Sequence, residues 1–149
     1  MSAIAYVDTS ALLKRFVREQ GTDDMVAFVA KGEFELAIST LTVTEFRSSM
    51  KRRLRLGLVS QLSVNKATEQ LLKEIASNAL IFHTIETATF NLASELIENL
   101  TAPLATLDSL HLASAKACGA SLMVSADKQL LRASTEANLD ILDFSSPKL

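Results

Sequence analysis

The stretch Ala5-Tyr6-Val7-Asp8-Thr9-Ser10-Ala11-Leu12-Leu13 contains a short apolar run that ends in an acid and passes directly into a helical pattern. An apolar run of this length is typical of a buried strand, and the residues that follow it favour a helix. In an open α/β sheet, functional groups gather at the carboxyl ends of the strands. Asp8 is therefore predicted to lie at the functional edge of a sheet.

Short apolar runs alternate with longer segments of helical periodicity along the whole chain. The runs cover residues 4–7, 36–39, 80–83, 122–124 and 141–142. Apolar stripes at helical spacing predict helices that contain residues 43–54, 67–75, 85–96 and 110–117. Gly57 is expected just past the end of the first of these helices. The alternation predicts an α/β fold with a parallel sheet.

The composition is that of one compact domain spanning residues 1–149. Of these 149 residues, 48% are hydrophobic, enough for a substantial core. The single cysteine cannot form a disulfide framework, no segment approaches the roughly 20 apolar residues that cross a bilayer, and the N-terminus lacks signal-peptide features. We therefore expect a soluble cytoplasmic protein without membrane contacts. The net charge of −2 means that only a local basic patch can indicate nucleic-acid binding.

Three further acids, Glu45, Asp108 and Asp127, lie at similar junctions with predicted helices. If the fold brings them to Asp8, two carboxylates ~4 Å apart repel by about 4 kcal/mol at an effective dielectric of ~20. A domain stable by only about 5–15 kcal/mol cannot hold several such pairs, so either some acids are protonated or a cation lies among them. Oxygen ligands favour Mg²⁺ or Mn²⁺, and a water activated by such an ion can hydrolyse a phosphodiester.

Each acid also has a structural explanation, because carboxylates near a helix N-terminus cap backbone amides. Thr42-Val43-Thr44-Glu45 fits a capping box, which would make Glu45 a cap. Asp8 is harder to explain in this way, because the hydroxyls of Thr9 and Ser10 can cap the helix in its place. His111, one turn after Asp108, could face the same site, but the favoured interpretation is a structural histidine that is hydrogen-bonded between helices.

Four segments resemble, in order, the acidic motifs of the PIN-domain ribonucleases, and within them the VapC-type toxins of toxin–antitoxin pairs. The segments are Tyr6-Val7-Asp8-Thr9-Ser10-Ala11-Leu12-Leu13-Lys14, Thr42-Val43-Thr44-Glu45-Phe46, Leu107-Asp108-Ser109-Leu110-His111-Leu112-Ala113 and Val124-Ser125-Ala126-Asp127-Lys128-Gln129-Leu130. Ser109 and Ser125 replace the alanine and threonine that many members carry there. The resemblance implies a PIN-like three-layer sandwich, a central parallel sheet flanked by helices on both faces. It also implies a magnesium or manganese site, an RNA substrate, a homodimer and an inhibitory antitoxin.

The resemblance also suggests a role for each acid. Asp8 and Asp108 are expected to be direct metal ligands, and Asp127 a ligand directly or through water. Glu45 is expected to position a second metal or the attacking water. The hydroxyls expected to orient these carboxylates or waters belong to Ser10 and Ser125.

A basic segment follows Glu45 without an intervening acid. Its residues are Arg47, Lys51, Arg52, Arg53 and Arg55. A charge run is usually a solvated face, but five basic residues beside a predicted catalytic acid, in a chain of negative net charge, favour RNA contact.

Other functions fit the sequence less well. A haloacid-dehalogenase-type phosphotransferase needs a second aspartate two residues after the first, and that position is Ser10. The chain has four glycines and neither a dinucleotide-binding nor a Walker motif. The remaining alternative is a non-catalytic PIN-like module that binds RNA or protein, against which the four acids argue.

Overall fold

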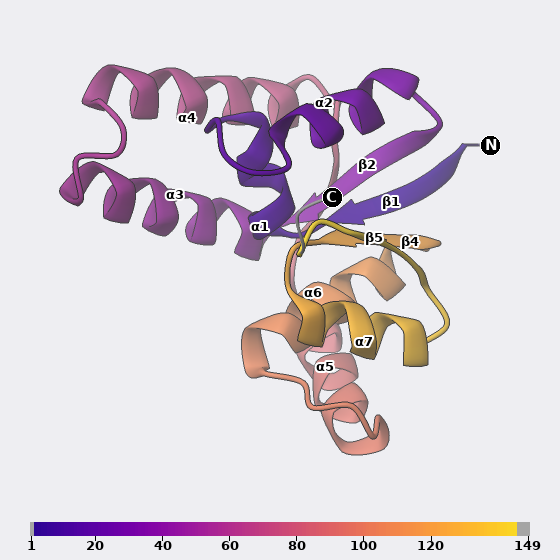
Figure 1. Cartoon of the computed structure of the whole chain (residues 1–149). Coiled ribbons are helices and arrows are strands. Elements are labelled where there is room, and N and C mark those ends of the chain that lie inside the picture. The colour runs from indigo at the N-terminus through magenta and orange to yellow at the C-terminus, as the bar shows by residue number, and fades with distance from the viewer. Residues whose placement is uncertain (1, 146–149) are drawn as a thin grey trace.

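The structure of the protein, a computed structural model, describes residues 2–145 and contains one five-stranded sheet between two groups of helices (Figure 1). The strands are β1 Ala3–Val7, β2 Phe34–Ser39, β3 Ile81–His83, β4 Leu122–Ser125 and β5 Asp140–Asp143. All neighbouring strands pair in parallel, in the order β3-β2-β1-β4-β5. The predicted PIN-like three-layer α/β sandwich is confirmed, and the strands lie within two residues of their predicted bounds.

Helices cover both faces of the sheet. One group comprises α1 Thr9–Leu12 with the 3-10 turn Leu13–Arg15, α2 Thr22–Lys31, α3 Thr40–Arg55 and α4 Gln61–Ala76. The other comprises α5 Thr87–Asn99, α6 Thr106–Ala117 and α7 Lys128–Glu136. The side chains of β1 alternate between the two faces of the sheet. Ala5 and Val7 pack in the core beneath the first group, and Tyr6 packs with α6 and α7. The two groups lie on opposite sides of the sheet in Figure 1.

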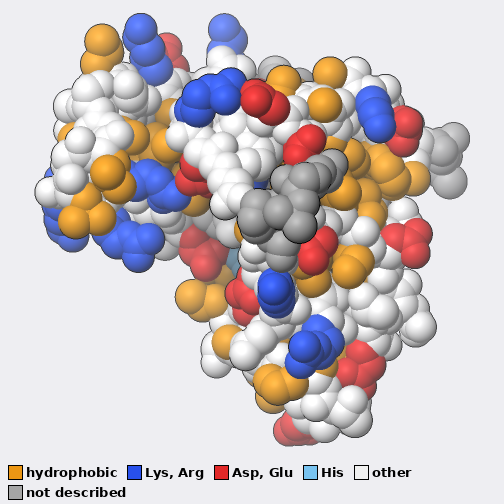
Figure 2. Space-filling view, viewed as in Figure 1, with side chains coloured by type: hydrophobic (Ala, Val, Ile, Leu, Met, Phe, Trp, Pro, Cys, Tyr) orange, Lys and Arg blue, Asp and Glu red, His pale blue; other side chains and the backbone are white. Residues whose placement is uncertain are grey.

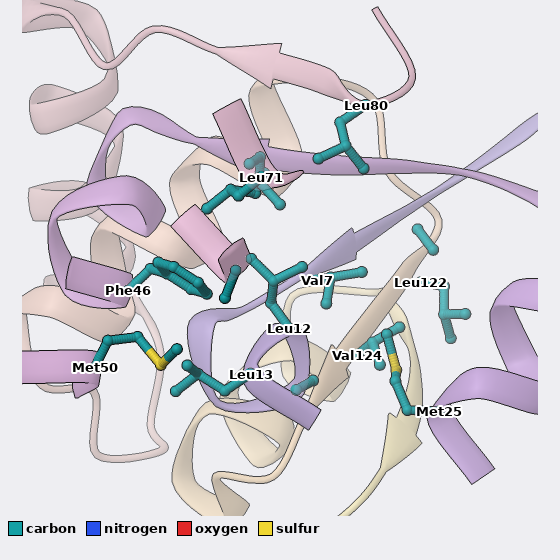
Figure 3. Close-up of a cluster of buried hydrophobic side chains, with 14 residues drawn as sticks. Val7, Leu12, Leu13, Met25, Phe46, Met50, Leu71, Leu80, Leu122 and Val124 are labelled. Carbon is teal, nitrogen blue, oxygen red and sulfur yellow. The ribbon is translucent and has the colours of Figure 1, made fainter. Parts of the chain in front are cut away.

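The core beneath the first group fixes α1 and α3 against the sheet. Figure 3 shows Val7, Leu12, Phe46, Leu71 and Val124 converging from β1, α1, α3, α4 and β4, and all five are at most 1% exposed. Burying one such side chain contributes about 1.5–3 kcal/mol. The helices that carry the candidate site residues are therefore held by well-packed apolar side chains.

Two helix starts differ from the predicted ones. The third predicted helix contains Ile85, but α5 begins at Thr87. The capping box predicted over Thr42–Glu45 is wrong, because Ser39 and Thr42 form it one turn earlier, with Ser39 N–H donating to Thr42 Oγ1 at 3.1 Å. The end of α3 is as predicted, with Gly57 just past it at φ +72°.

The strand order creates a switch point between β1 and β4. From β1 the chain adds β2 and β3 on one side, and then returns to place β4 on the other side of β1. The carboxyl ends of β1 and β4 are adjacent, since Val7 pairs with Val124 and the N–H of Asp8 donates to the Val124 carbonyl at 3.0 Å. Such switch points are where open α/β sheets bind ligands.

Within residues 2–145, the structure contains no helix that is both long and apolar enough to span a lipid bilayer.

Candidate active site

The four acids come from four separate elements. Asp8 directly follows β1, and Asp127 lies two residues after β4 as the N-cap of α7. Asp108 lies in the first turn of α6. Glu45 was expected to open its helix but lies in the second turn of α3, because that helix starts at Thr40.

Asp8 is the most enclosed of the four acids, with 4% of its surface exposed. Ser10 Oγ donates to its Oδ1 and Ser125 Oγ to its Oδ2, both at 2.7 Å. Its Oδ1 also accepts the Ala11 N–H at 3.0 Å, so Asp8 itself caps α1. The expectation that Thr9 and Ser10 would cap that helix in its place is therefore wrong.

The two serines also tie the ends of β1 and β4 together. Ser10 Oγ accepts the N–H of Ala126 at 3.0 Å, and Ser125 Oγ accepts the N–H of Asp127 at 2.9 Å. Both hydroxyls thus donate to Asp8 and accept from the loop that carries Asp127. This arrangement fixes the Asp8 carboxylate relative to the start of α7.

The carboxyl groups of Asp108 and Asp127 interact with each other. Burial, followed by the nearby Asp127 carboxylate and more weakly by Asp8, raises the pKa of Asp108 to about 7. Asp127 Oδ1 accepts the N–H groups of Gln129 and Leu130, so its structural role as a helix cap is real as well. Burial also raises the pKa of Asp8 above its ordinary value, although the hydrogen bond from Ser125 opposes that rise.

The Glu45 carboxylate is held by side chains from α1 and α6. Its Oε1 accepts from Thr9 Oγ1 at 2.7 Å and from His111 Nε2 at 2.5 Å. Burial raises the pKa of Glu45, but the hydrogen bonds and the charge of His111 outweigh it, so the pKa is below its ordinary value. The Glu45 side chain is 26% exposed.

Sequence reasoning missed these partners of Glu45. Thr9 was considered only as a helix cap. For His111, a place facing the same site was considered, but a hydrogen bond between helices was favoured. His111 does pack inside the protein, at 2% exposure, but its Nε2 contacts a candidate catalytic acid from another layer. Its place one turn after Asp108 was the only signal in the sequence.

A pocket of about 510 Å³ opens beside the acids. Its wall includes Glu45, Ser10, Arg52 and Arg53, together with the immediate neighbours of Asp108 and Asp127. Figure 2 shows basic side chains over the α3 and α4 end of the molecule, with acidic side chains beside them toward the middle. The wall of the pocket therefore combines Glu45 with a basic rim formed by Arg52 and Arg53.

The basic segment divides between two faces of α3. Arg52 follows Glu45 by seven residues and thus lies on the same helix face, whereas Arg47 and Lys51 line a separate pocket against α4. Arg53 pairs with Glu19 at 3.2 Å and also donates to Ser49. The fifth basic residue, Arg55, is exposed at the end of the helix.

The acids have the chemistry that a hard divalent cation requires, although they are not arranged as a closed metal site. Within residues 2–145, no three acidic, histidine or cysteine side chains are close enough to hold a metal ion. The donor atoms of Asp8, Asp108 and Asp127 are all carboxylate oxygens. Burial is the largest cause of the raised pKa of Asp108, and the nearby Asp127 and Asp8 carboxylates add to it; a cation would offset their repulsion. This donor set fits Mg²⁺ or Mn²⁺.

The fold and the site define the class of protein: an α/β sandwich with an acidic site at the switch point of its parallel sheet. Sequence comparison identifies the family. The family model for the PIN domain matches residues 5–136. The chain therefore belongs to the PIN domain family. A search of curated proteins finds no significant match to the sequence.

Solved structures with the same fold include components of toxin–antitoxin systems. VapC20 of Mycobacterium tuberculosis, described as a sarcin-ricin loop cleaving toxin, is similar with a TM-score of 0.68 at 14% identity, over 87% of this chain and 94% of that one. VapBC2 of Rickettsia felis, bound to a promoter DNA fragment, has a TM-score of 0.62 at 16% identity, over 94% and 98%. FitAcB of Neisseria gonorrhoeae has a TM-score of 0.63 at 16% identity, over 95% of this chain and 98% of that one. At these identities the likeness concerns the fold.

Proposed function

We propose that this protein is a metal-dependent endoribonuclease that hydrolyses RNA phosphodiester bonds. The observation that carries the proposal is the meeting of acids from separate elements at the β1–β4 switch point, where Asp108 is electrostatically linked to both Asp127 and Asp8. A folded domain gains nothing in stability from crowding these carboxylates. Perturbed acids beside a pocket are typical of a functional site.

The carboxylates would hold the cofactor, and the neighbouring side chains would keep them in place. Asp8, Asp108 and Asp127 are the proposed ligands of Mg²⁺ or Mn²⁺. When bound, such an ion would neutralise the carboxylates and stabilise negative charge that develops on the phosphate. Ser10 and Ser125 hold both oxygens of Asp8 in a fixed direction.

Glu45 is proposed to orient the attacking water. It is ionised, partly exposed and on the wall of the pocket, so it can accept a hydrogen bond from a water there. Both hydrogen bonds from protein donors reach its Oε1, which leaves Oε2 as the oxygen for that water. A water held in this way has a fixed orientation toward the phosphate in place of free rotation.

The basic rim of the pocket is proposed to bind the RNA backbone. Arg52 is exposed and shares the pocket with Glu45, so it is the strongest candidate for a phosphate contact near the acids. Arg53 is engaged by Glu19 and can assist through its remaining donors. Arg47, Lys51 and Arg55 would contact RNA outside this pocket.

RNA cleavage by the purified protein tests the enzymatic proposal. Wild type with Mn²⁺ should cut a structured RNA substrate, and wild type in EDTA should not. Asp8→Asn should lose detectable activity, whereas Glu95→Gln, a matched loss of one exposed carboxylate on α5, should remain fully active. RNA binding without cleavage under all these conditions would favour the non-catalytic PIN-like module instead.

We also propose that the protein is a toxin controlled by a cognate antitoxin and that it forms a homodimer in the cytoplasm. Neighbours of the same fold are described as VapBC and FitAcB, and VapC20 as a toxin. Expressed alone in bacteria, wild type should arrest growth and Asp8→Asn should not. Co-expression of the small protein encoded next to it should restore growth. Unimpaired growth at confirmed wild-type expression would refute the toxin role and leave a non-toxic nuclease.

A further inference from the structure

A hydrogen-bonded chain of four side chains runs from the candidate active site into the opposite layer of the protein. Glu45 Oε1 meets His111 Nε2 at 2.5 Å, and His111 Nδ1 meets the Tyr6 hydroxyl at 2.7 Å. The Tyr6 hydroxyl lies 2.9 Å from Ser39 Oγ. The members come from α3, α6, β1 and the end of β2, so three layers of the sandwich contribute to it.

Both ring nitrogens of His111 are engaged, which fixes the orientation of the imidazole. An ionised carboxylate can only accept, so Nε2 must carry a hydrogen and donate it to Glu45. The Tyr6 hydroxyl donates its own hydrogen to Ser39 Oγ, and its oxygen is 2.7 Å from His111 Nδ1. The ring therefore cannot rotate without breaking a buried hydrogen bond.

The inner end of the chain is rigid. Tyr6, His111 and Ser39 are at most 2% exposed. Ser39 is also the N-cap of α3 and accepts from the backbone at Thr42, so its oxygen is tied to the start of the helix that carries Glu45. The chain therefore connects the first turn of α3 to the carboxylate of its second turn through two other elements.

We propose that His111, held by Tyr6, is a positioning residue that fixes the Glu45 carboxylate for its work on water or substrate. Thr9 supplies the second donor to the same oxygen, at 2.7 Å. A glutamate side chain has three rotatable bonds, and two donors on one oxygen restrict it to the orientation in which the other oxygen is available. This inference rests on the proposed nuclease function.

Two substitutions at His111 separate positioning from packing. In His111→Gln the side-chain amide nitrogen can occupy the place of Nε2 and still donate to Glu45. In His111→Asn the shorter amide can replace Nδ1 toward Tyr6 but cannot reach Glu45. Both variants remove the ring, so they share any loss of packing, and the melting temperature of each is measured to confirm that it folds.

The expected result is a difference in kcat between the two variants. His111→Asn should lose roughly 10–100-fold in kcat with little change in KM, as is usual when a partner that orients a functional group is removed. His111→Gln should stay within about threefold of wild type. Equal losses in the two variants, or full activity in both, would overturn the proposal.

A measurement without turnover tests the Glu45–His111 contact separately from the proposed function. The chain has only two histidines, so imidazole ¹⁵N spectra can be assigned with a His83→Gln variant. The His111 signals should show a protonated Nε2 in wild type and should move in Glu45→Gln and in Tyr6→Phe. An unprotonated Nε2, or signals unchanged in both variants, would overturn the proposal. If instead wild type cleaves no RNA while these signals behave as expected, the nuclease function fails and the Glu45–His111 contact stands.

Discussion

Asp8 combines two roles that are usually regarded as alternatives. It caps α1 through the Ala11 N–H, and it offers a buried carboxylate at the switch point of the sheet. The same double use applies to Asp127, which caps α7 and raises the pKa of Asp108. At these positions a helix cap is therefore compatible with a functional acid.

Substitutions of Asp8 should separate the two roles. Asp8→Asn keeps one oxygen acceptor for the cap and removes a charge whose burial is unfavourable, so without metal it should be at least as stable as wild type. Asp8→Ala loses the cap as well and should be destabilised by about 0.5–2 kcal/mol or more. Urea denaturation in EDTA measures both. A destabilised Asp8→Asn with a neutral Asp8→Ala would contradict this account.

Asp108 should make the stability of the metal-free protein depend on pH. Its pKa is raised from 3.8 to about 7 in the folded state. The contribution of Asp108 to the free energy of unfolding is therefore fully present below about pH 4, where the carboxyl is protonated in both the folded and the unfolded protein. This contribution is lost as the pH rises toward 7. Asp8, with its raised pKa, contributes in the same direction.

The comparison with Asp108→Asn isolates this effect from other titrating groups. In EDTA, the free energy of unfolding of wild type, relative to that of Asp108→Asn, should fall as the pH increases from 4 to 7. Denaturant midpoints measured at several pH values give this difference. A difference that stays constant or increases over the range would show that the Asp108 carboxyl is not crowded.

At the scale of single elements, α3 carries both a candidate catalytic acid and the basic residues proposed to bind RNA. Its helical geometry decides which basic residues can act beside the acid. Arg52 shares the pocket with Glu45, and Arg47 faces α4. The sequence showed the charge run but not its division, because the division depends on where α4 packs.

Arg52→Gln and Arg47→Gln form a matched pair, since each removes one positive charge from the same helix. In an Asp8→Asn background that prevents cleavage, Arg52→Gln should weaken RNA binding more strongly. It should also reduce the slope of log affinity against log salt by about 0.7, the value for one lost phosphate contact on a single strand. Fluorescence anisotropy over a salt series measures both quantities. Equal effects of the two substitutions would place the RNA elsewhere.

The strands could be predicted well from the sequence, because each is a short apolar run that reports its own burial. The helix α2 was not among the predicted helices, and only Met25 and Thr22 are buried in it. The capping box was misplaced by one turn, since Ser39 and Thr42 satisfy the same local pattern as Thr42 and Glu45. Which of the two pairs forms the capping box depends on where β2 ends, and it ends at Ser39.

The contact between His111 and Glu45 could not be predicted from local patterns. The two residues are 66 positions apart and belong to helices on opposite faces of the sheet. They meet because both helices begin near the carboxyl edge of the sheet. Asp8, Asp108 and Asp127 could be located in advance, because each lies at a junction that the sequence marks, whereas Glu45 lies one turn inside its helix.

At the scale of the whole molecule, the strand order β3-β2-β1-β4-β5 is what brings the acidic residues together. The return of the chain to the free side of β1 places β4, and with it Ser125 and Asp127, beside Asp8. α6 then adds Asp108 from the second helical layer. The site therefore depends on the complete sandwich and should be lost on global unfolding, together with any cation bound to it.

Thermal melting with and without Mn²⁺ tests the central claim, that these acids form a divalent-cation site. A cation that binds only the folded protein stabilises it by RT ln(1 + [L]/Kd), about 2.7 kcal/mol at a hundredfold excess over Kd. Wild type and Glu95→Gln should melt at clearly higher temperature in Mn²⁺ than in EDTA, and Asp8→Asn should lose most of that gain. Identical melting of wild type in Mn²⁺ and in EDTA would contradict the account.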